Sequence, residues 1–356
     1  MNDRFLRACR REPVDVTPVW FMRQAGRYMP EYRALRDKYS LLELCRQPEL
    51  AVEVTLQPLD VLDVDAAILF SDLLLPFTPM GLDFDFVKGE GPAIDNPIRS
   101  GSDIDRLVRF ESRESLAHVL EAIRLLRRAL VNRVPLIGFG GAPFTLASYA
   151  IEGGPSRDYL RTKSLMYNEP RAWHRLCELF AEVIADYLLA QIEAGAQAVQ
   201  IFDSWVGALS VGDYREFALP HTKRIFQRLA DESAGDRIAG SGVPTIHFGV
   251  GTTALLAEMA KAGGDVIGVD WRQPLDVSWN AIGAARGIQG NLDPATLFGP
   301  EDRLRAAADD ILRRAEGRPG HIFNLGHGVL PTTPVERLQL LARHVKSPRT
   351  RLSPAS

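Results

Sequence analysis

The stretch Ala196-Gln-Ala-Val-Gln-Ile-Phe-Asp-Ser204 is mostly apolar and ends in two polar residues. A strand with one solvated face would alternate apolar and polar residues along its length, whereas this run predicts a parallel strand buried on both faces. Runs of the same kind recur along the chain, and most lead towards a helical pattern. They span 17–23, 66–72, 135–141, 243–249, 265–270, 287–293 and 321–327.

Helical patterns lie between these runs. Apolar residues repeat at helical spacing over 116–130 and 171–194, and 301–316 has acids at its start and arginines near its end. Thr333-Pro-Val-Glu336 predicts a helix start with Thr333 as the N-cap and Glu336 closing a capping box. Strands that alternate with helices in this way indicate an α/β protein.

Eight such strands match a closed (β/α)8 barrel best. The alternative is an open doubly wound sheet in two domains, but no Pro/Gly/Ser-rich linker divides the chain. We therefore expect a single barrel domain over residues 1–345, with insertions at 24–48 and 73–113, after the first and second strands. Residues 346–356 are expected to form a flexible tail.

Composition places the chain among ordinary globular proteins. It has 356 residues, of which 46% are hydrophobic and 24% charged, and a formal charge of −3. This balance gives no indication of nucleic-acid or membrane binding. Three cysteines without a C-x-x-C pair predict neither disulfides nor a thiolate metal site. Because no apolar run approaches about 18 residues and the N-terminus lacks a signal-peptide pattern, we expect a cytoplasmic protein.

Polar residues that follow the predicted strands are the candidate site residues, because barrel active sites lie at the C-terminal ends of the strands. Each also has an ordinary structural explanation: paired arginines, a helix cap, a packed tyrosine, a turn serine or a core histidine. The candidates are Arg23 and Arg27 after the first strand, Asp72 after the second, Tyr149 beyond the third, Ser204 after the fourth and His327 after the eighth.

Common cofactor motifs are weak or missing. Gly249-Val-Gly251-Thr-Thr-Ala254, with Asp270 following, imitates a dinucleotide-binding fingerprint, but any tight turn after a strand favours glycine. The seven histidines show no H-E-x-x-H spacing, and the chain has neither a G-x-S-x-G elbow nor a Walker A loop. These observations predict an anion-binding barrel with no metal and no visible cofactor.

Two long motifs make the sequence similar to a known family. Pro18-Val-Trp-Phe-Met-Arg-Gln-Ala-Gly-Arg-Tyr-Met-Pro-Glu-Tyr32 and Gly141-Ala-Pro-Phe-Thr-Leu-Ala-Ser-Tyr-Ala-Ile-Glu-Gly-Gly154 resemble the two signatures of the uroporphyrinogen decarboxylase family. Phe70-Ser-Asp72, Phe202-Asp-Ser-Trp205 and Asn324-Leu-Gly-His-Gly328 fit the same family. The resemblance extends over nearly the whole chain.

This resemblance implies a barrel enzyme, usually a homodimer, that removes four acetate carboxyls from uroporphyrinogen III without metal or organic cofactor. The product would be coproporphyrinogen III, on the route to haem and chlorophyll. The implied catalytic residues are Asp72, Arg27 and Tyr149. The implied substrate-binding residues are Arg23, Gln24, Ala25, Gly26, Arg27, Asp72, Tyr149, Ser204 and His327.

The candidate residues suit this chemistry. A pyrrole protonated at a ring carbon can accept the electrons left by departing CO₂, and Asp72 would stabilise the resulting cation. Arg23 and Arg27 would bind substrate carboxylates in bidentate fashion. The group that delivers the ring proton stays open between Tyr149 and a water molecule.

Two other functions are weighed against this one. A zinc- and cobalamin-linked methyltransferase of the same superfamily would carry a His-x-Cys metal motif near the fifth strand, where this chain has His247-Phe-Gly249. A non-catalytic tetrapyrrole carrier would need the arginines but would have no reason to bury Asp72 against its ligand.

Overall fold

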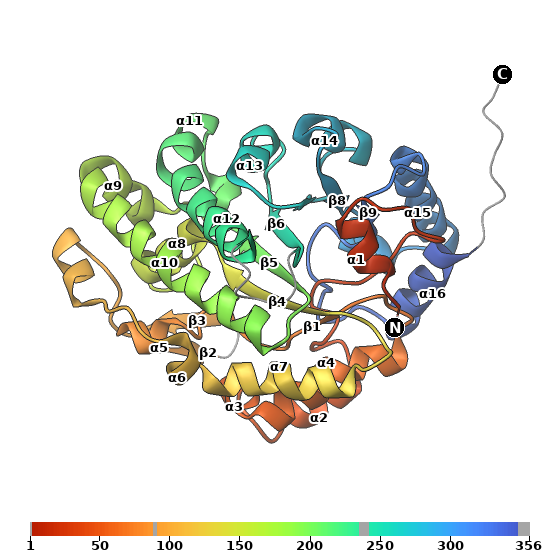
Figure 1. Ribbon diagram of the computed structural model, residues 1–356, viewed down its shortest axis with the longest axis horizontal. Helices are drawn as coiled ribbons and strands as arrows, with labels where there is room; N and C mark the ends of the chain where they lie inside the picture. The colour runs from red at the N-terminus through yellow and green to blue at the C-terminus, as the bar shows by residue number, and fades with distance from the viewer. Residues whose placement is uncertain (1, 88–90, 235–241, 348–356) are drawn as a thin grey trace.

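Seven parallel strands form the central sheet of the computed structural model, which describes residues 2–87, 91–234 and 242–347 (Figure 1). Their order in the sheet is β1-β4-β5-β6-β7-β8-β9, so each strand pairs with the next one along the chain. This is the order expected for the runs from 66–72 to 321–327. The strands are β1 (Ala67–Ile68), β4 (Leu136–Gly141), β5 (Ala198–Asp203), β6 (Thr245–Gly249), β7 (Val266–Gly268), β8 (Gly287–Gln289) and β9 (His321–Ile322).

Helices cover the outer side of this sheet (Figure 1). The predicted helices 116–130, 171–194 and 301–316 are confirmed as α7 (Ala117–Ala129), α10 (Pro170–Ala194) and α15 (Glu301–Ala315). The other long elements are α4 (Pro48–Val61), α8 (Pro143–Glu152), α9 (Leu160–Asn168), α12 (Leu219–Ala234), α13 (Leu256–Ala262), α14 (Leu275–Ile282) and α16 (Val335–Lys346). No helix among the described residues is both long and apolar enough to cross a bilayer.

The sheet is strongly curled. Gln200 of β5 and Gln289 of β8 meet on its inner face, where Gln289 Nε2 donates to Gln200 Oε1 over 3.0 Å. Trp20 Nε1 in turn donates to Gln289 Oε1 over 3.0 Å. Since β5 and β8 are separated by two strands, their side chains meet only because the sheet bends round on itself. The molecule is therefore a mixed α/β protein whose sheet wraps around a packed interior.

The strand predicted over 17–23 is wrong in extent. The segment forms one parallel bridge, Val19 to Phe323, next to β9. On its other side, the N–H of Asp65 donates to the carbonyl of Val19 over 2.7 Å. A longer ladder is prevented because Pro18 has no N–H and the N–H of Val19 donates to the Asp65 side chain instead. The segment thus lies between β9 and the chain that enters β1.

The predicted start of the last helix is also wrong. Pro334, not Thr333, occupies the N-cap of α16, and no side chain caps this helix. The N–H of Thr333 closes a turn onto the carbonyl of Leu330, and its hydroxyl has no hydrogen-bond partner among the described residues. The helix therefore begins too late for Thr333 to reach its free N–H groups.

The two long segments predicted as insertions carry short elements of their own. Residues 24–48 contain α2 (Pro30–Arg36) and α3 (Leu41–Arg46). Residues 73–113 contain α5 (Phe77–Met80), the antiparallel pair β2 (Phe84–Val87) and β3 (Gly91–Ile94), the 3₁₀ helix η1 (Gly101–Arg106) and the start of α6 (Ser112–Ser115). The remaining short elements are α1 (Arg4–Cys9), η2 (Val206–Ala208), α11 (Val211–Asp213), the π-helix η3 (Tyr214–Ala218) and η4 (Pro294–Phe298).

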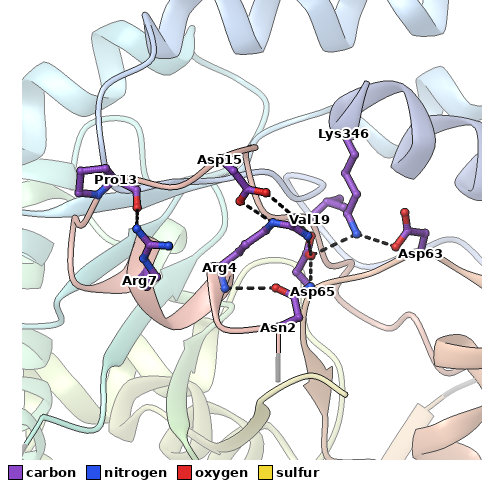
Figure 2. Close-up of polar contacts among 9 residues, drawn as sticks. All are labelled: Asn2, Arg4, Arg7, Pro13, Asp15, Val19, Asp63, Asp65 and Lys346. Atoms are coloured by element: carbon purple, nitrogen blue, oxygen red, sulfur yellow. Dashed lines mark hydrogen bonds and ion pairs between the residues drawn. The ribbon is translucent and has the colours of Figure 1, made fainter. Parts of the chain in front are cut away.

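A buried carboxylate, that of Asp65, binds both ends of the chain (Figure 2). It accepts hydrogen bonds from Asn2 Nδ2 at 2.6 Å and from the Val19 N–H at 2.8 Å. Lys346 Nζ lies 3.1 Å from the same carboxylate and 2.7 Å from exposed Asp63. Lys346, expected in the tail, is thus the fixed last residue of α16, and Ser347 is its C-cap. Residues 348–356 of that tail lie outside the described residues.

Asp65 and Asp63 form a matched pair for mutation, because both contact Lys346 but their side chains are 0% and 66% exposed. We expect Asp65→Asn to lower the free energy of unfolding by about 3 kcal/mol or more, since it removes a fully buried negative charge that faces both Lys346 and Arg4. Asp63→Asn should cost less than about 1 kcal/mol. Urea unfolding followed by circular dichroism measures both; equal losses would mean that the buried carboxylate does not hold this junction.

Candidate functional site

Four predicted site residues follow the carboxyl ends of strands, at the same edge of the sheet. Asp72 follows β1, Tyr149 lies on α8 after β4, Ser204 directly follows β5, and His327 follows β9. Each is partly exposed, although most residues of the preceding strands are buried. Parallel strands bring their carboxyl ends together, so these side chains lie at one end of the sheet.

Arg23 lies against the loop that carries His327. The N–H of Met22 donates to Asn324 Oδ1, and the N–H of Val329 donates to the carbonyl of Met22. A Cβ on Gly328 would lie only 2.4 Å from Arg23 Cδ, so the arginine side chain crosses the space that this glycine leaves open. Arg23 also has a φ of 60°, a left-handed conformation that is rare for a residue with a side chain.

The residues of the stretch 23–27 differ in their exposure to solvent. Arg23 and Arg27 are exposed, whereas Gln24 is buried. The Gln24 amide accepts from the N–H of Phe21 and donates to the carbonyl of Ala66, so this side chain holds the loop rather than facing a ligand. Ala25 and Gly26 are partly exposed, and a Cβ on Gly26 would lie 3.3 Å from the Arg23 carbonyl oxygen. The structure thus presents two guanidinium groups on a loop that the buried Gln24 side chain holds in place.

His327 is a neutral hydrogen-bond donor. Burial, aided by the positive charges of Arg23 and Arg272, lowers its pKa to about 4. Its Nδ1 accepts the N–H of Gly328 over 2.7 Å. Because one ring nitrogen accepts, the proton of the neutral ring lies on Nε2, which is left to donate to a ligand.

Asp72 supplies the carboxyl group of the site. Burial raises its pKa to about 6, and a hydrogen bond from the Leu74 N–H and the charge of Arg23 only partly oppose this rise. Burial likewise raises the pKa of Tyr149, with Asp72 adding to the rise and Arg23 opposing it. The phenol therefore stays protonated at neutral pH. Arg23 acts electrostatically on Asp72, Tyr149 and His327, which places all four groups in one environment.

Trp205 is a site residue that the sequence analysis did not predict. Its ring lies 3.7 Å from that of Tyr149, centroid to centroid, at an interplanar angle of 32°. The Tyr159 ring packs edge-on against the same Trp205 ring, with the two centroids 5.2 Å apart. The only signal was its place in Phe202-Asp-Ser-Trp205, directly after two polar residues. Together the three rings form an apolar wall beside Ser204.

A second unpredicted feature is the loop after β7. Arg272 Nη1 pairs with Asp270 Oδ2 at 2.5 Å and its guanidinium lies 4.3 Å from the centre of the Trp271 ring. A Cβ on Gly326 would lie 2.5 Å from the Trp271 nitrogen, so this loop packs directly on the one that carries His327. Asp270 also accepts the N–H of Gly251. The residues that imitate a dinucleotide fingerprint are therefore bonded to one another.

Potential metal ligands are scattered. Within residues 2–87, 91–234 and 242–347, no three His, Cys, Asp or Glu side chains are placed to hold a metal ion together. His247, the residue weighed as a zinc ligand, points to the outer side of the sheet, where its ring lies 5.4 Å from that of Phe226 on α12.

The arrangement suits a ligand with many carboxylates and a ring that carries N–H groups. Two exposed guanidinium groups, a neutral imidazole donor and a phenol donor can all bind carboxylates or carbonyl oxygens. A partly desolvated carboxylate among them can accept N–H groups and stabilise a cation.

Comparisons with known proteins agree over nearly the whole length of the chain. The family model described as "Uroporphyrinogen decarboxylase (URO-D)" matches residues 1–348. Proteins named uroporphyrinogen decarboxylase from Sorangium cellulosum and Chloroflexus aurantiacus are 57% and 55% identical, over 99% and 98% of this chain and 98% and 96% of theirs. Among solved structures, a methyltransferase from Methanosarcina mazei is similar, with a TM-score of 0.77, 21% identity and 97% coverage of both chains; this likeness concerns the fold alone.

The raised pKa of Asp72 makes a prediction about stability. Between about pH 4 and pH 6 the folded state holds a proton that the unfolded state has lost, so ionising Asp72 destabilises the fold, fully above about pH 6. We expect Asp72→Asn to raise the free energy of unfolding at pH 7.5 by about 1–2 kcal/mol and to lose this gain near pH 4. Urea unfolding at both pH values, with exposed Asp231→Asn as the control, measures it; a loss of stability at pH 7.5 would make Asp72 a structural residue.

Proposed function

Because the chain belongs to the uroporphyrinogen decarboxylase family, we propose that it converts uroporphyrinogen III to coproporphyrinogen III with the residues around Arg23 and Asp72. The observation that carries the assignment to these residues is a partly desolvated carboxylate within the electrostatic reach of an arginine and a protonated phenol. The activity is that of a carboxy-lyase acting on four acetate side chains in turn.

Each turnover replaces one carboxylate by hydrogen: –CH₂–COO⁻ and one proton give –CH₃ and CO₂. A proton first adds to a ring carbon of the pyrrole that bears the acetate. The bond between the CH₂ group and the carboxylate then breaks, CO₂ leaves, and its electron pair neutralises the cationic ring. The exocyclic carbon then takes up a proton, and the ring carbon releases the one it gained. The substrate supplies its own electron sink.

Asp72 stabilises the cation in this scheme. Its carboxylate accepts the pyrrole N–H groups, whose positive charge increases when the ring carbon is protonated. The interaction is therefore stronger in the transition state than in the bound substrate, which is the requirement for catalysis rather than mere binding. A carboxylate with a pKa near 6 is still ionised at neutral pH and can fill this role.

The other residues bind and orient the carboxylates. Arg23 and Arg27 hold side-chain carboxylates through their bidentate guanidinium groups. His327 donates from Nε2, and Ser204 adds a hydroxyl beside the aromatic wall. Tyr149 is a phenol that stays protonated, in part because the charge of Asp72 raises its pKa. The ring proton comes either from this phenol or from a water molecule.

The proposal also includes the closure of the barrel and the assembly of the protein. The bridge between Val19 and Phe323, with the Asp65 to Val19 hydrogen bond, supports segment 17–23 as the eighth member of a closed (β/α)8 barrel spanning residues 1–345. The family resemblance further supports a cytoplasmic homodimer, which sedimentation of the purified protein tests.

The activity itself is tested with reduced uroporphyrinogen. Incubation followed by oxidation and chromatography should show stepwise loss of carboxylates, and turnover should survive EDTA and desalting. Binding without any product would indicate a tetrapyrrole carrier instead. Loss of turnover on chelation, restored by Zn²⁺, would favour a metal-dependent reaction of the methyltransferase kind.

Charge at Asp72 should control the chemical step. We expect Asp72→Asn to lower kcat about 10²-fold or more, with a smaller effect on product binding. In the wild type kcat/KM should fall as pH drops through about 6, because the carboxylate becomes protonated. Initial rates between pH 5 and 8 measure both, with Asp231→Asn as the control. An Asn variant with most of its kcat would contradict the proposed role.

Gly328 should matter through Arg23. A Cβ at Gly328 would lie 2.4 Å from Arg23 Cδ and 2.7 Å from its Cγ, so Gly328→Ala must displace the guanidinium group. We expect kcat/KM to fall roughly tenfold or more, as the loss of about 1.4 kcal/mol of binding implies. Gly212→Ala is the control, because the nearest atom to its Cβ is Ser210 Oγ at an ordinary 3.7 Å. Equal kinetics of the two variants would show that Arg23 is not needed in this position.

A further inference from the structure

A buried carboxylate lies directly behind the site. Asp203 is the last residue of β5 and is 0% exposed. Its Oδ1 accepts a hydrogen bond from the hydroxyl of Thr145, also 0% exposed, over 2.9 Å. Neighbouring residues of a strand point to opposite faces. Asp203 therefore faces the covering helices, while Ser204, the next residue, is turned towards the site.

Thr145 connects this carboxylate to the aromatic wall of the site. Its hydroxyl accepts the N–H of Trp205 over 3.3 Å while donating to Asp203. Thr145 and Tyr149 are one turn apart on α8, and the Tyr149 ring lies on that of Trp205 at 3.7 Å. A single hydroxyl thus joins the end of β5, the loop after it and the helix that carries the phenol.

The second carboxylate oxygen of Asp203 has fewer polar contacts than the first. Oδ2 has no hydrogen-bond partner among the described residues, and the nearest basic group, His247 Nε2, is 3.8 Å away. Burial, reinforced by the charge of Asp203, raises the pKa of both Cys177 and Tyr214 beside it. A carboxylate buried in this way costs more than an apolar residue would. What it provides is a strong, directed acceptor for Thr145.

We infer that Asp203 and Thr145 are positioning residues, which fix the plane of the Tyr149 ring against Trp205 and the direction of Ser204. Neither residue touches the substrate. They act through the hydrogen bond from Thr145 to Asp203 and the one from the Trp205 N–H to Thr145. The inference rests on the proposed roles of Tyr149 and Ser204 in the decarboxylase.

Loss of the Thr145 hydroxyl should free Trp205 and let the stacked phenol shift. A displacement of about 1 Å in a positioned group can cost on the order of 10²-fold in rate. Thr145→Val removes the hydroxyl at nearly constant shape, whereas Thr145→Ser keeps it. Asp203→Asn keeps an oxygen that can accept from Thr145 but removes the charge.

Thr245 is the matched control. Its hydroxyl donates to Asp265 Oδ2 over 2.8 Å and accepts the Asp265 N–H over 3.2 Å. Like Thr145, this residue thus donates to a carboxylate and accepts a backbone N–H through its hydroxyl. It begins β6 at the opposite end of the sheet from the site. Thr245→Val should therefore lower the melting temperature without affecting the site.

Two measurements on the full chain test the inference. The first is the near-ultraviolet circular dichroism of the Tyr149–Trp205 stack, defined as the signal that Trp205→Phe removes from the wild-type spectrum. The second is kcat with reduced uroporphyrinogen. We expect Thr145→Val to lose the stack signal and at least about tenfold in kcat, and Thr145→Ser and Asp203→Asn to retain both within about threefold. Thr245→Val should match the wild type in both.

The inference is overturned if Thr145→Val keeps the stack signal, if Thr145→Ser fails to retain it, or if Thr245→Val loses as much kcat. Should Thr145→Val not fold, Thr145→Ala takes its place, and retention of the stack signal in that variant overturns the inference, because it also lacks the hydroxyl. A wild type that does not decarboxylate uroporphyrinogen refutes the proposed function alone, since the spectroscopic comparison needs no substrate.

Discussion

The carboxylate of Asp65 holds the junction on which the site depends. It binds the N–H of Val19, and Val19 forms the bridge to Phe323 next to β9. Arg23 and His327 each follow their member of this bridge by four residues, so one pairing sets the two loops side by side. The same carboxylate receives Asn2 and Lys346 from the two ends of the chain (Figure 2). This junction, together with the hydrogen bonds of Met22 to Asn324 and Val329, brings the arginine and the histidine together.

The site residues are held in costly states, which is typical of functional sites. Arg23 has a left-handed backbone, Asp72 keeps a carboxylate where burial disfavours its charge, and His327 stays neutral beside two guanidinium groups. The surrounding structure compensates through ordinary means: the buried amide of Gln24, the Asn324 side chain and the glycine at 328. A scaffold made of buried parallel strands is rigid enough to maintain these states.

Much of this could be predicted from the sequence, because the signal was local. Uniformly apolar runs such as 196–204 predicted the strands, and the polar residues at their ends predicted Asp72, Ser204 and His327. The failures depended on distant partners. Segment 17–23 looks like a strand until the Val19 N–H is found on Asp65, and the tail residue Lys346 is fixed by the same carboxylate. Trp205 and Arg272 became site residues only through contacts with Tyr149 and the His327 loop, which no spacing along the chain reveals.

The junction between Val19 and Phe323 also has a consequence for the order of events during synthesis. Ribosomes make the N-terminal part of a chain first, and domains fold as units once their long-range partners exist. Arg23 leaves the ribosome early, but His327 and Lys346 are made near the end, so most of the chain must wait before this pairing can form. A stalled or prematurely terminated chain would carry Asp72, Tyr149 and Ser204 without the partners that complete the site.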